Sequence, residues 1–333
     1  MLAFIFTIDY EIYGNGEGSL RGLVYDPVEA LIKVFDDAQA RFVAFVEVSE
    51  LEQIERQGAD AAVIDVKRQV ADMHARGFEI GLHLHPQWCN ARYEEGRWQL
   101  DYSEYNLCTL SRKRIEEIVG GGISHLRGMV GDPSFMPRSF RAGNWLFQPT
   151  QVVSAVLAQR GLWIDSSVFK GGVQRLHGLD YRPSKRNGYY WQFREDVNVA
   201  CPDGPLLEIP IHVTPVPFWR MVTAKRVGMQ RRNLSAAQPR RLSFRRGLDY
   251  LRFWHPMKLD FCRMTLDELK LTVDAAIRLD HEEPSSLKPL VAIGHSKDLV
   301  DVDTVASLLH FLKERGVVVT TLDQVYQRCR DSL

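Results

Sequence analysis

This 333-residue sequence lacks several features that define common protein classes. Its five cysteines are odd in number, widely spaced and free of CxxC pairs, which excludes a zinc-thiolate site and favours a reducing compartment. Its net charge is zero, so no overall field attracts nucleic acid. The apolar residues 1–8 have no basic leader and are too few for a membrane span, which needs roughly 20. We therefore predict that they form a first strand and that the protein is cytoplasmic.

Segments typical of strands and helices alternate along the chain. Apolar runs predict strands at 2–8, 42–48, 78–82, up to Arg141, 162–165, 206–211, 290–294 and 317–320. Helical patterns lie at 27–40, 60–76, 111–119, 149–160, 265–279, 301–315 and 322–330. Alternating β and α units with near-continuous apolar strands indicate an α/β protein with a parallel sheet covered on both faces. About seven such units suggest a (β/α) barrel in one domain spanning residues 1–333, with an insertion around 215–260.

Polar residues gather at the carboxyl ends of successive predicted strands. In (β/α) barrels this end carries the active site, because the βα loops meet there. A random distribution of polar residues would not favour one end of each strand. The residues in question are Asp9, Glu11, His83, His85, Arg141, Asp165 and His295.

Two pairs among these residues have the spacing that directs side chains to one face of a strand. His83 and His85 are two residues apart, as are Asp9 and Glu11, and strand side chains alternate between faces. Two imidazoles and one carboxylate leave a fourth tetrahedral position open on Zn²⁺, which is how catalytic zinc sites are built. The alternative for the histidines is a hydrogen-bonded pair in the core. We predict a divalent metal site, with zinc as the expected ion.

The other three residues each have a catalytic and a structural interpretation. His295 is suited to be a general acid, since imidazole titrates near neutrality, or it caps a strand end. Arg141 is suited to clamp a carboxylate, or it is a solvated loop arginine. Asp165 is suited to orient a histidine, or it caps the next turn. None of the three is decisive alone.

Taken together, the segments TIDYE, GLHLH, FRAGNW, DSS and IGHS resemble, in this order, the motifs of the polysaccharide deacetylase family, the NodB-type carbohydrate esterases. The resemblance covers about residues 3–170 and 205–325. It implies a distorted (β/α) barrel, a divalent metal that is usually zinc, and hydrolysis of an amide C–N bond.

The resemblance also implies roles for individual residues. Asp9 matches the general base, His83 the first metal-binding histidine, and Arg141 the arginine that holds the base. His295 matches the general acid, and Asp165 the aspartate that tunes this acid. Glu208, in the predicted strand 206–211, is expected near the site.

Two positions depart from the family pattern. The second, metal-binding aspartate of the family falls on Tyr10, and the second histidine, four residues after the first, falls on Gln87. Glu11 and His85 are the available substitutes. Two assignments stay open here: Glu11 binds the metal while Asp9 is the base, or Asp9 is itself a metal ligand.

A basic segment follows the predicted strand 206–211. Between Trp219 and Lys258, eleven Lys and Arg stand against one acidic residue, Asp249, and aromatic residues are interleaved with them. The segment is suited to attract a nucleotide- or lipid-linked sugar, an acidic polysaccharide or a membrane surface, or it is a solvated face. No nucleic-acid-binding motif accompanies it.

The sequence therefore predicts a metal-dependent deacylase. We expect it to remove an N-acetyl group from an amino sugar during bacterial surface-polysaccharide synthesis, as for O-antigen, lipopolysaccharide or capsule. A deformylase or another amidase is the second interpretation. A catalytically degenerate carbohydrate-binding protein is the third, favoured by Tyr10 and Gln87.

Overall fold

The computed structural model describes residues 1–221 and 253–332, and its centre is a nine-stranded sheet. Seven parallel strands form the path through this sheet: β11 (Leu206–Glu208), β7 (Ile164–Asp165), β6 (Ser139–Ala142), β3 (Glu79–Leu84), β2 (Val43–Glu47), β1 (Leu2–Tyr10) and β14 (Lys288–His295). β10 (Trp191–Phe193) adds an antiparallel strand beside β11, and β15 (Val318–Thr320) pairs with β1.

The sheet curls until its two ends meet. Beyond β11 the chain reaches β14, where Ile211 bridges Val291 and the His212 amide donates to the Val291 carbonyl at 2.9 Å. Asp260 forms a further parallel bridge with Ile293. These short bridges close the curled sheet without a full ladder, so the predicted distorted (β/α) barrel is confirmed.

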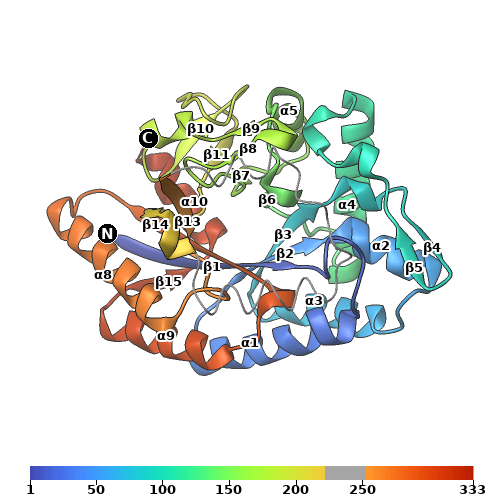
Figure 1. Ribbon diagram of the computed structural model, residues 1–333, viewed down its shortest axis with the longest axis horizontal. Helices are drawn as coiled ribbons and strands as arrows, with labels where there is room; N and C mark the ends of the chain where they lie inside the picture. The colour runs from blue at the N-terminus through green and yellow to red at the C-terminus, as the bar shows by residue number, and fades with distance from the viewer. Residues whose placement is uncertain (222–252, 333) are drawn as a thin grey trace.

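Helices pack around the outside of the sheet (Figure 1). They are α1 (Asp26–Asp37), α2 (Val48–Gln57), α3 (Val63–Ala75), α4 (Arg112–Val130), α5 (Gln151–Gln159), α8 (Leu266–Glu282) and α9 (Val302–Glu314), whereas α10 (Leu322–Asp331) packs against the interior side of the sheet. Within residues 1–221 and 253–332, no helix is both long and apolar enough to cross a bilayer.

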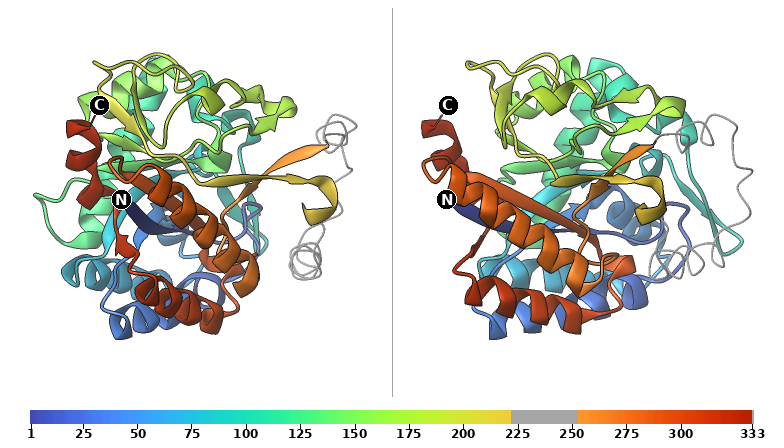
Figure 2. Two further views of the ribbon diagram at one scale, coloured as in Figure 1. Left: turned by 90° about the vertical axis from the view of Figure 1, so that its left-hand side faces the viewer. Right: turned by 60° about the vertical axis from the view of Figure 1, so that its left-hand side comes forward.

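Short two-stranded sheets lie outside the nine-stranded sheet. They are β4 (Arg92–Glu94) with β5 (Arg97–Gln99), β8 (Val173–Gln174) with β9 (Leu179–Asp180), and β12 (Val213–Pro217) with β13 (Trp254–Lys258). The β12–β13 pair extends away from the barrel (Figure 2) and flanks the predicted basic insertion. Residues 222–252, which hold most of that insertion, lie outside the described part of the chain.

Two helices differ from the expectation. α2 was not predicted, and α4 extends to Val130 although its pattern suggested an end at residue 119. Three consecutive glycines at 120–122, unfavourable in a helix by propensity, caused the second error. A Cβ on Gly122 would lie 3.0 Å from Val48 and 3.1 Å from Leu84, so close packing against α2 and β3 outweighs this propensity.

The two faces of the strands have different surroundings. On β1 the side chains of Phe4, Phe6 and Ile8 pack towards the outer helices, whereas Ala3 and Ile5 face the barrel interior. α10 closes the amino-terminal end of this interior with Leu322 and other apolar side chains. The interior is therefore apolar at one end, and its carboxyl end holds the polar groups described below.

The closure by α10 leads to a stability prediction. Leu322 is fully buried in the interior cluster, so Leu322→Ala should lower the free energy of unfolding by about 2–5 kcal/mol. Leu279→Ala on α8 is the matched control, because this side chain is 50% exposed and its loss should cost about 0.5 kcal/mol or less. Urea denaturation measures both, and equal midpoints would contradict the role of α10.

Candidate metal and catalytic site

The carboxyl ends of neighbouring strands bring most of the predicted residues together. Strand register pairs Asp9 of β1 with His295 of β14, and His83 of β3 with Arg141 of β6. Glu11 follows β1 on the same face as Asp9, and all five side chains are buried. Burying so many ionisable groups is costly unless each has a partner, so their contacts define the site.

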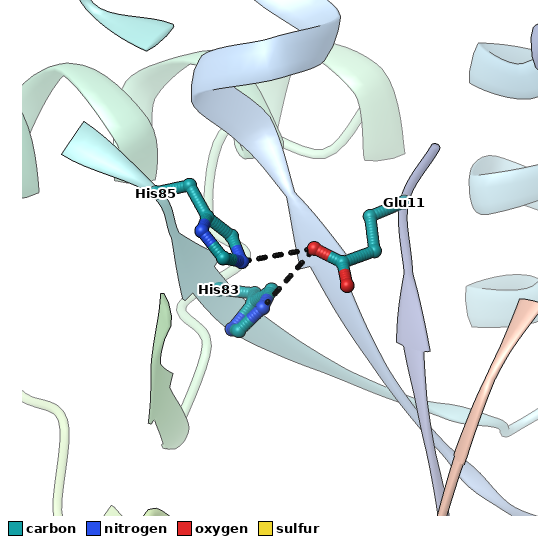
Figure 3. A group of neighbouring side chains, drawn as sticks. All are labelled: Glu11, His83 and His85. Carbon is teal, nitrogen blue, oxygen red and sulfur yellow. Dashed lines mark ion pairs between the residues drawn. The ribbon is translucent and has the colours of Figure 1, made fainter. Parts of the chain in front are cut away.

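Glu11 and the two histidines form a compact group in which the rings point at one carboxylate (Figure 3). Oε2 of Glu11 lies 2.9 Å from Nε2 of His85 and 3.6 Å from Nε2 of His83. The rings are nearly perpendicular, with centroids 4.9 Å apart. The predicted convergence of His83 and His85 therefore occurs, with one carboxylate oxygen between them.

The donor atoms of this group fit a divalent cation. Nδ1 of His83 is 2.8 Å from the Arg141 carbonyl oxygen, which can only accept, so Nδ1 carries the proton and Nε2 has its lone pair free. Nε2 of His83 is buried and has no hydrogen-bond partner in the described part of the chain. Metal-binding histidines commonly donate their second nitrogen to a carbonyl in this way. Glu11, His83 and His85 can thus hold a divalent metal.

The second oxygen of Glu11 has a different partner. Oε1 accepts from Nζ of Lys297 at 2.6 Å, and Lys297 also donates to the Ile12 carbonyl. Burial raises the pKa of Glu11, but Lys297 and His85 outweigh this and hold the pKa well below its usual range. Glu11 is therefore ionised at neutral pH, which a metal ligand requires.

Asp9 is held by Arg141 across the barrel interior. Nη1 of Arg141 donates to Oδ1 of Asp9 at 2.6 Å, while the other guanidinium nitrogens donate to Thr7 and Ser166. The guanidinium lies over the Phe45 ring at 4.2 Å. Burial raises the pKa of Asp9, yet Arg141 and the nearby histidines keep it below its ordinary value. Asp9 is therefore an oriented carboxylate with Oδ2 left for other contacts.

His295 lies on the free side of Asp9. Its Nε2 is 3.5 Å from Oδ2 of Asp9, and its Nδ1 is 3.8 Å from Oδ2 of Asp298. Two guanidinium nitrogens of Arg263 donate to this same Oδ2 of Asp298. Burial lowers the pKa of His295 to about 4, despite the opposing effect of Asp9. The imidazole is thus neutral at pH 7 until a proton reaches it.

The structure does not bring Asp165 to this cluster. Asp165 is on the outer face of β7, where Oδ1 accepts from the Ser167 hydroxyl at 2.7 Å and the carboxyl group interacts with Glu208. Glu208, also expected near the site, is buried on the same outer face. Strand parity points both side chains towards the helices, where burial raises the pKa of each, although the charge of Arg141 still acts to lower it. Asp298 is the carboxylate beside His295 instead.

The two departures from the family pattern have separate explanations. Tyr10 points away from the site, and its hydroxyl donates to Oε1 of Gln69 on α3 at 2.6 Å. A tyrosine at this position therefore does not remove a ligand from the site. Gln87 does lie at the site, with its side-chain nitrogen 3.1 Å from Nδ1 of His85. Gly143 packs against the same ring: a Cβ there would come within 2.8 Å of Nδ1 of His85.

Besides Asp298, sequence reasoning missed two further charged residues of the site. Lys297 follows His295 by two positions, the same spacing that identified the other pairs. Glu47 ends β2, and its carboxylate accepts from the backbone amides of His85 at 2.7 Å and Glu50 at 2.5 Å. Burial raises the pKa of Glu47 to about 7. Both follow the rule of polar residues at strand ends and could have been found with it.

The two tryptophans next to the motifs have different positions. Trp88 is buried and packs against Trp98, so it is part of the core. Trp145 is partly buried, and its ring packs edge-on against His295 with centroids 5.8 Å apart. Of the two, only Trp145 borders the site.

Comparison with solved structures gives the fold an independent reference. A protein from Mycobacterium smegmatis classed as a polysaccharide deacetylase aligns with a TM-score of 0.55 and 15% identity, over 99% of this chain and 91% of that chain. One from Pseudomonas aeruginosa PAO1 aligns with a TM-score of 0.51 and 11% identity, over 98% and 90%. The allantoinase PuuE gives 0.52 and 12%, over 98% and 89%. No family model and no curated protein matches the sequence. At these identities the similarity establishes the fold, which is that of polysaccharide deacetylases.

The geometry predicts one divalent ion per chain. Zinc titrated into metal-free protein should bind with a stoichiometry of one and raise the unfolding free energy, by about 2.7 kcal/mol at 100 times Kd. His85→Ala should weaken zinc binding by more than about 100-fold, since loss of outer contacts alone costs 10–100-fold. His310→Ala, a 73% exposed histidine side chain on α9, is the matched control. Calorimetry checks both; equal affinities would contradict the assignment.

Proposed function

We propose that this chain, which has the fold of polysaccharide deacetylases, is a metal-dependent hydrolase that removes the acyl group from an N-acylated amino sugar. The observation that carries the proposal is the pairing of two distinct carboxylates on one face of β1. Glu11 faces the histidines, while Asp9 is held by Arg141 next to His295. A binding protein has no need for an oriented base beside an imidazole.

Glu11, His83 and His85 are the proposed metal ligands, and zinc is the proposed ion. When bound, such an ion polarises the acyl carbonyl and lowers the pKa of a water molecule. Lys297 keeps Glu11 ionised and occupies its second oxygen, so one oxygen is presented to the cation. Of the two assignments left open by the sequence, we adopt the one with Glu11 as ligand.

Asp9 is the proposed general base. Arg141 fixes Oδ1, so Oδ2 takes the proton of the attacking water. The lowered pKa of Asp9 keeps this carboxylate unprotonated and ready to accept. Its partners Thr7 and Ser166 hold the guanidinium in turn, which makes Arg141 a positioning residue that acts through Asp9.

His295 is the proposed general acid for the leaving amine. Because burial lowers its pKa to about 4, the ring must receive a proton during the reaction. Oδ2 of Asp9, 3.5 Å from Nε2, provides a direct route from the base to the acid. The proton taken from water thereby reaches the amine nitrogen when the C–N bond breaks.

The substrate we propose is an amino sugar carrying an N-acetyl group, used in bacterial surface-polysaccharide synthesis such as that of O-antigen, lipopolysaccharide or capsule. The unpaired cysteines accord with a cytoplasmic site for this reaction. We propose further that the sugar is attached to a lipid carrier. Trp219, Phe253 and Trp254 are 62%, 63% and 58% exposed at the end of the β12–β13 pair, and aromatic rings of this kind favour a membrane interface.

Activity assays on the zinc-loaded protein test the proposal. Wild type should release acetate from N-acetylated amino sugars, and Asp9→Asn and His295→Ala should each lower kcat by about 10²–10⁴-fold. Both variants should keep zinc, because Glu11 and the two histidines remain. Formate release from N-formyl substrates measures the deformylase alternative in the same assay.

Three results would count against this mechanism. Zinc binding without turnover of any acetylated or formylated substrate would favour the carbohydrate-binding alternative. Loss of zinc in His295→Ala, with retention in His83→Ala, would place the ion among Asp9, Glu11 and His295 instead. Full activity in Asp9→Asn would remove the proposed base.

Membrane contact is tested separately by vesicle sedimentation. The double variant Trp219→Ala, Trp254→Ala should bind vesicles that contain anionic lipid less tightly than wild type does, because anionic surfaces attract basic segments. Trp163→Ala is the matched control, because this exposed ring stacks on Tyr326 of α10, away from the β12–β13 pair. Equal sedimentation of all three proteins would exclude an aromatic anchor.

A further inference from the structure

Lys258 is an ionisable residue beside the site that the proposed mechanism does not use. It is the last residue of β13, and its side chain is partly exposed. Its Nζ lies 2.9 Å from the centroid of the Trp145 ring and 4.9 Å from that of Phe169. The same Trp145 ring contacts His295. One indole therefore separates the Lys258 amine from the proposed acid.

The turn that carries this indole is strained and firmly held. Asn144 and Trp145 both have positive φ, 55° and 59°, a conformation that is unfavourable for residues other than glycine. The Tyr181 hydroxyl donates to the Trp145 carbonyl at 2.7 Å and accepts from the Phe147 amide at 3.2 Å. Backbone strain of this kind is concentrated at functional sites, where the surroundings enforce one position.

Lys258 differs in its partners from Arg141 and Lys297, two other basic residues at the site. Arg141 is paired with Asp9, and Lys297 with Glu11. In the described ranges, the Lys258 amine has no hydrogen bond and no carboxylate within ion-pair distance, while Asp260, two residues after β13, is 3.7 Å from Arg263. Burial lowers the pKa of Lys258 well below its usual range, against the opposing effect of Asp260, and so favours the neutral amine in the absence of a ligand. An anion bound beside the amine would favour its charged form. An amine in this position gains more from an anionic partner than from the indole alone.

We propose that Lys258 binds an anionic substituent of the substrate, a carboxylate or a phosphate, and so selects charged amino sugars over neutral ones. The inference rests on the proposed function, because it names the substrate class of the same site. The Trp145 ring contacts both the imidazole of His295 and the Lys258 amine, so a sugar that reaches His295 can extend past this ring to Lys258. Lys258 is thus a specificity residue that takes no part in proton transfer.

Binding of inorganic phosphate and acetate to the metal-free protein tests the anion site without any turnover. Wild type should bind one of the two by calorimetry, and Lys258→Met should weaken that binding by about tenfold or more, as expected for loss of a charge-assisted hydrogen bond. Lys258→Arg should retain it. Lys270→Met is the matched control, since Lys270 on α8 also lies over a ring, that of Phe311 at 5.3 Å.

Turnover assays provide a second test of the proposed anion site. With zinc present, wild type should have a higher kcat/KM for N-acetylglucosamine 1-phosphate or N-acetylmuramic acid than for N-acetylglucosamine, by about tenfold or more. Lys258→Met should remove this preference by raising KM for the charged sugar. A preference for the phosphate indicates a phosphorylated or carrier-linked sugar, and a preference for the muramic acid indicates a carboxylated one.

The outcomes separate this inference from the proposed function. Absence of anion binding in wild type, or equal binding in Lys258→Met, overturns the role of Lys258 whether or not the enzyme is active. Turnover that does not distinguish neutral from charged sugars also overturns it. Anion binding that depends on Lys258, without turnover of any sugar, supports the anion site and rejects the hydrolase.

Discussion

The ion pair between Arg141 and Asp9 is the contact on which the site depends. Both side chains are buried, and taking two charges out of water is costly unless every remaining donor and acceptor is satisfied. Thr7, Ser166 and the Phe45 ring meet that requirement for the guanidinium. One oxygen of Asp9 is consumed by this arrangement, and the other faces His295. The backbone carbonyl of Arg141 also fixes the tautomer of His83. Arg141 therefore orients both the Asp9 carboxylate and one imidazole of the metal-binding group.

Strand parity decides which residues belong to the site. Every second residue of β1 faces the barrel interior, so Asp9 and Glu11 lie in the site while Tyr10 bonds to Gln69 among the helices. The same rule removes Asp165 from the site, because it occupies the outer face of β7. A shift of one residue exchanges the two faces of a strand. A tyrosine at position 10, where the family pattern has an aspartate, therefore removes no side chain from the barrel interior.

The barrel separates stability from chemistry along its axis. α10 and the apolar interior residues fill the amino-terminal end, where packing supplies the folding energy. The ionisable groups occupy the carboxyl end, where Arg141 pairs with Asp9 and Lys297 with Glu11, while Glu47 accepts from backbone amides. Packing at the apolar end can thus offset the free-energy cost of burying ionisable groups at the carboxyl end. The rigid barrel also keeps these groups oriented.

The sequence by itself determined the parallel α/β architecture and the positions of most strands along the chain. It also determined that Asp9 shares a strand face with Glu11, and His83 with His85. These follow from periodicities of two and 3.6 residues, which are local properties of the chain. Only the tertiary structure decided which carboxylate faces the histidines, that Asp298 rather than Asp165 lies beside His295, and that Lys258 stands over Trp145. These contacts join segments far apart in the chain, and closure of the barrel fixes them through strand register and close packing, which no local pattern encodes.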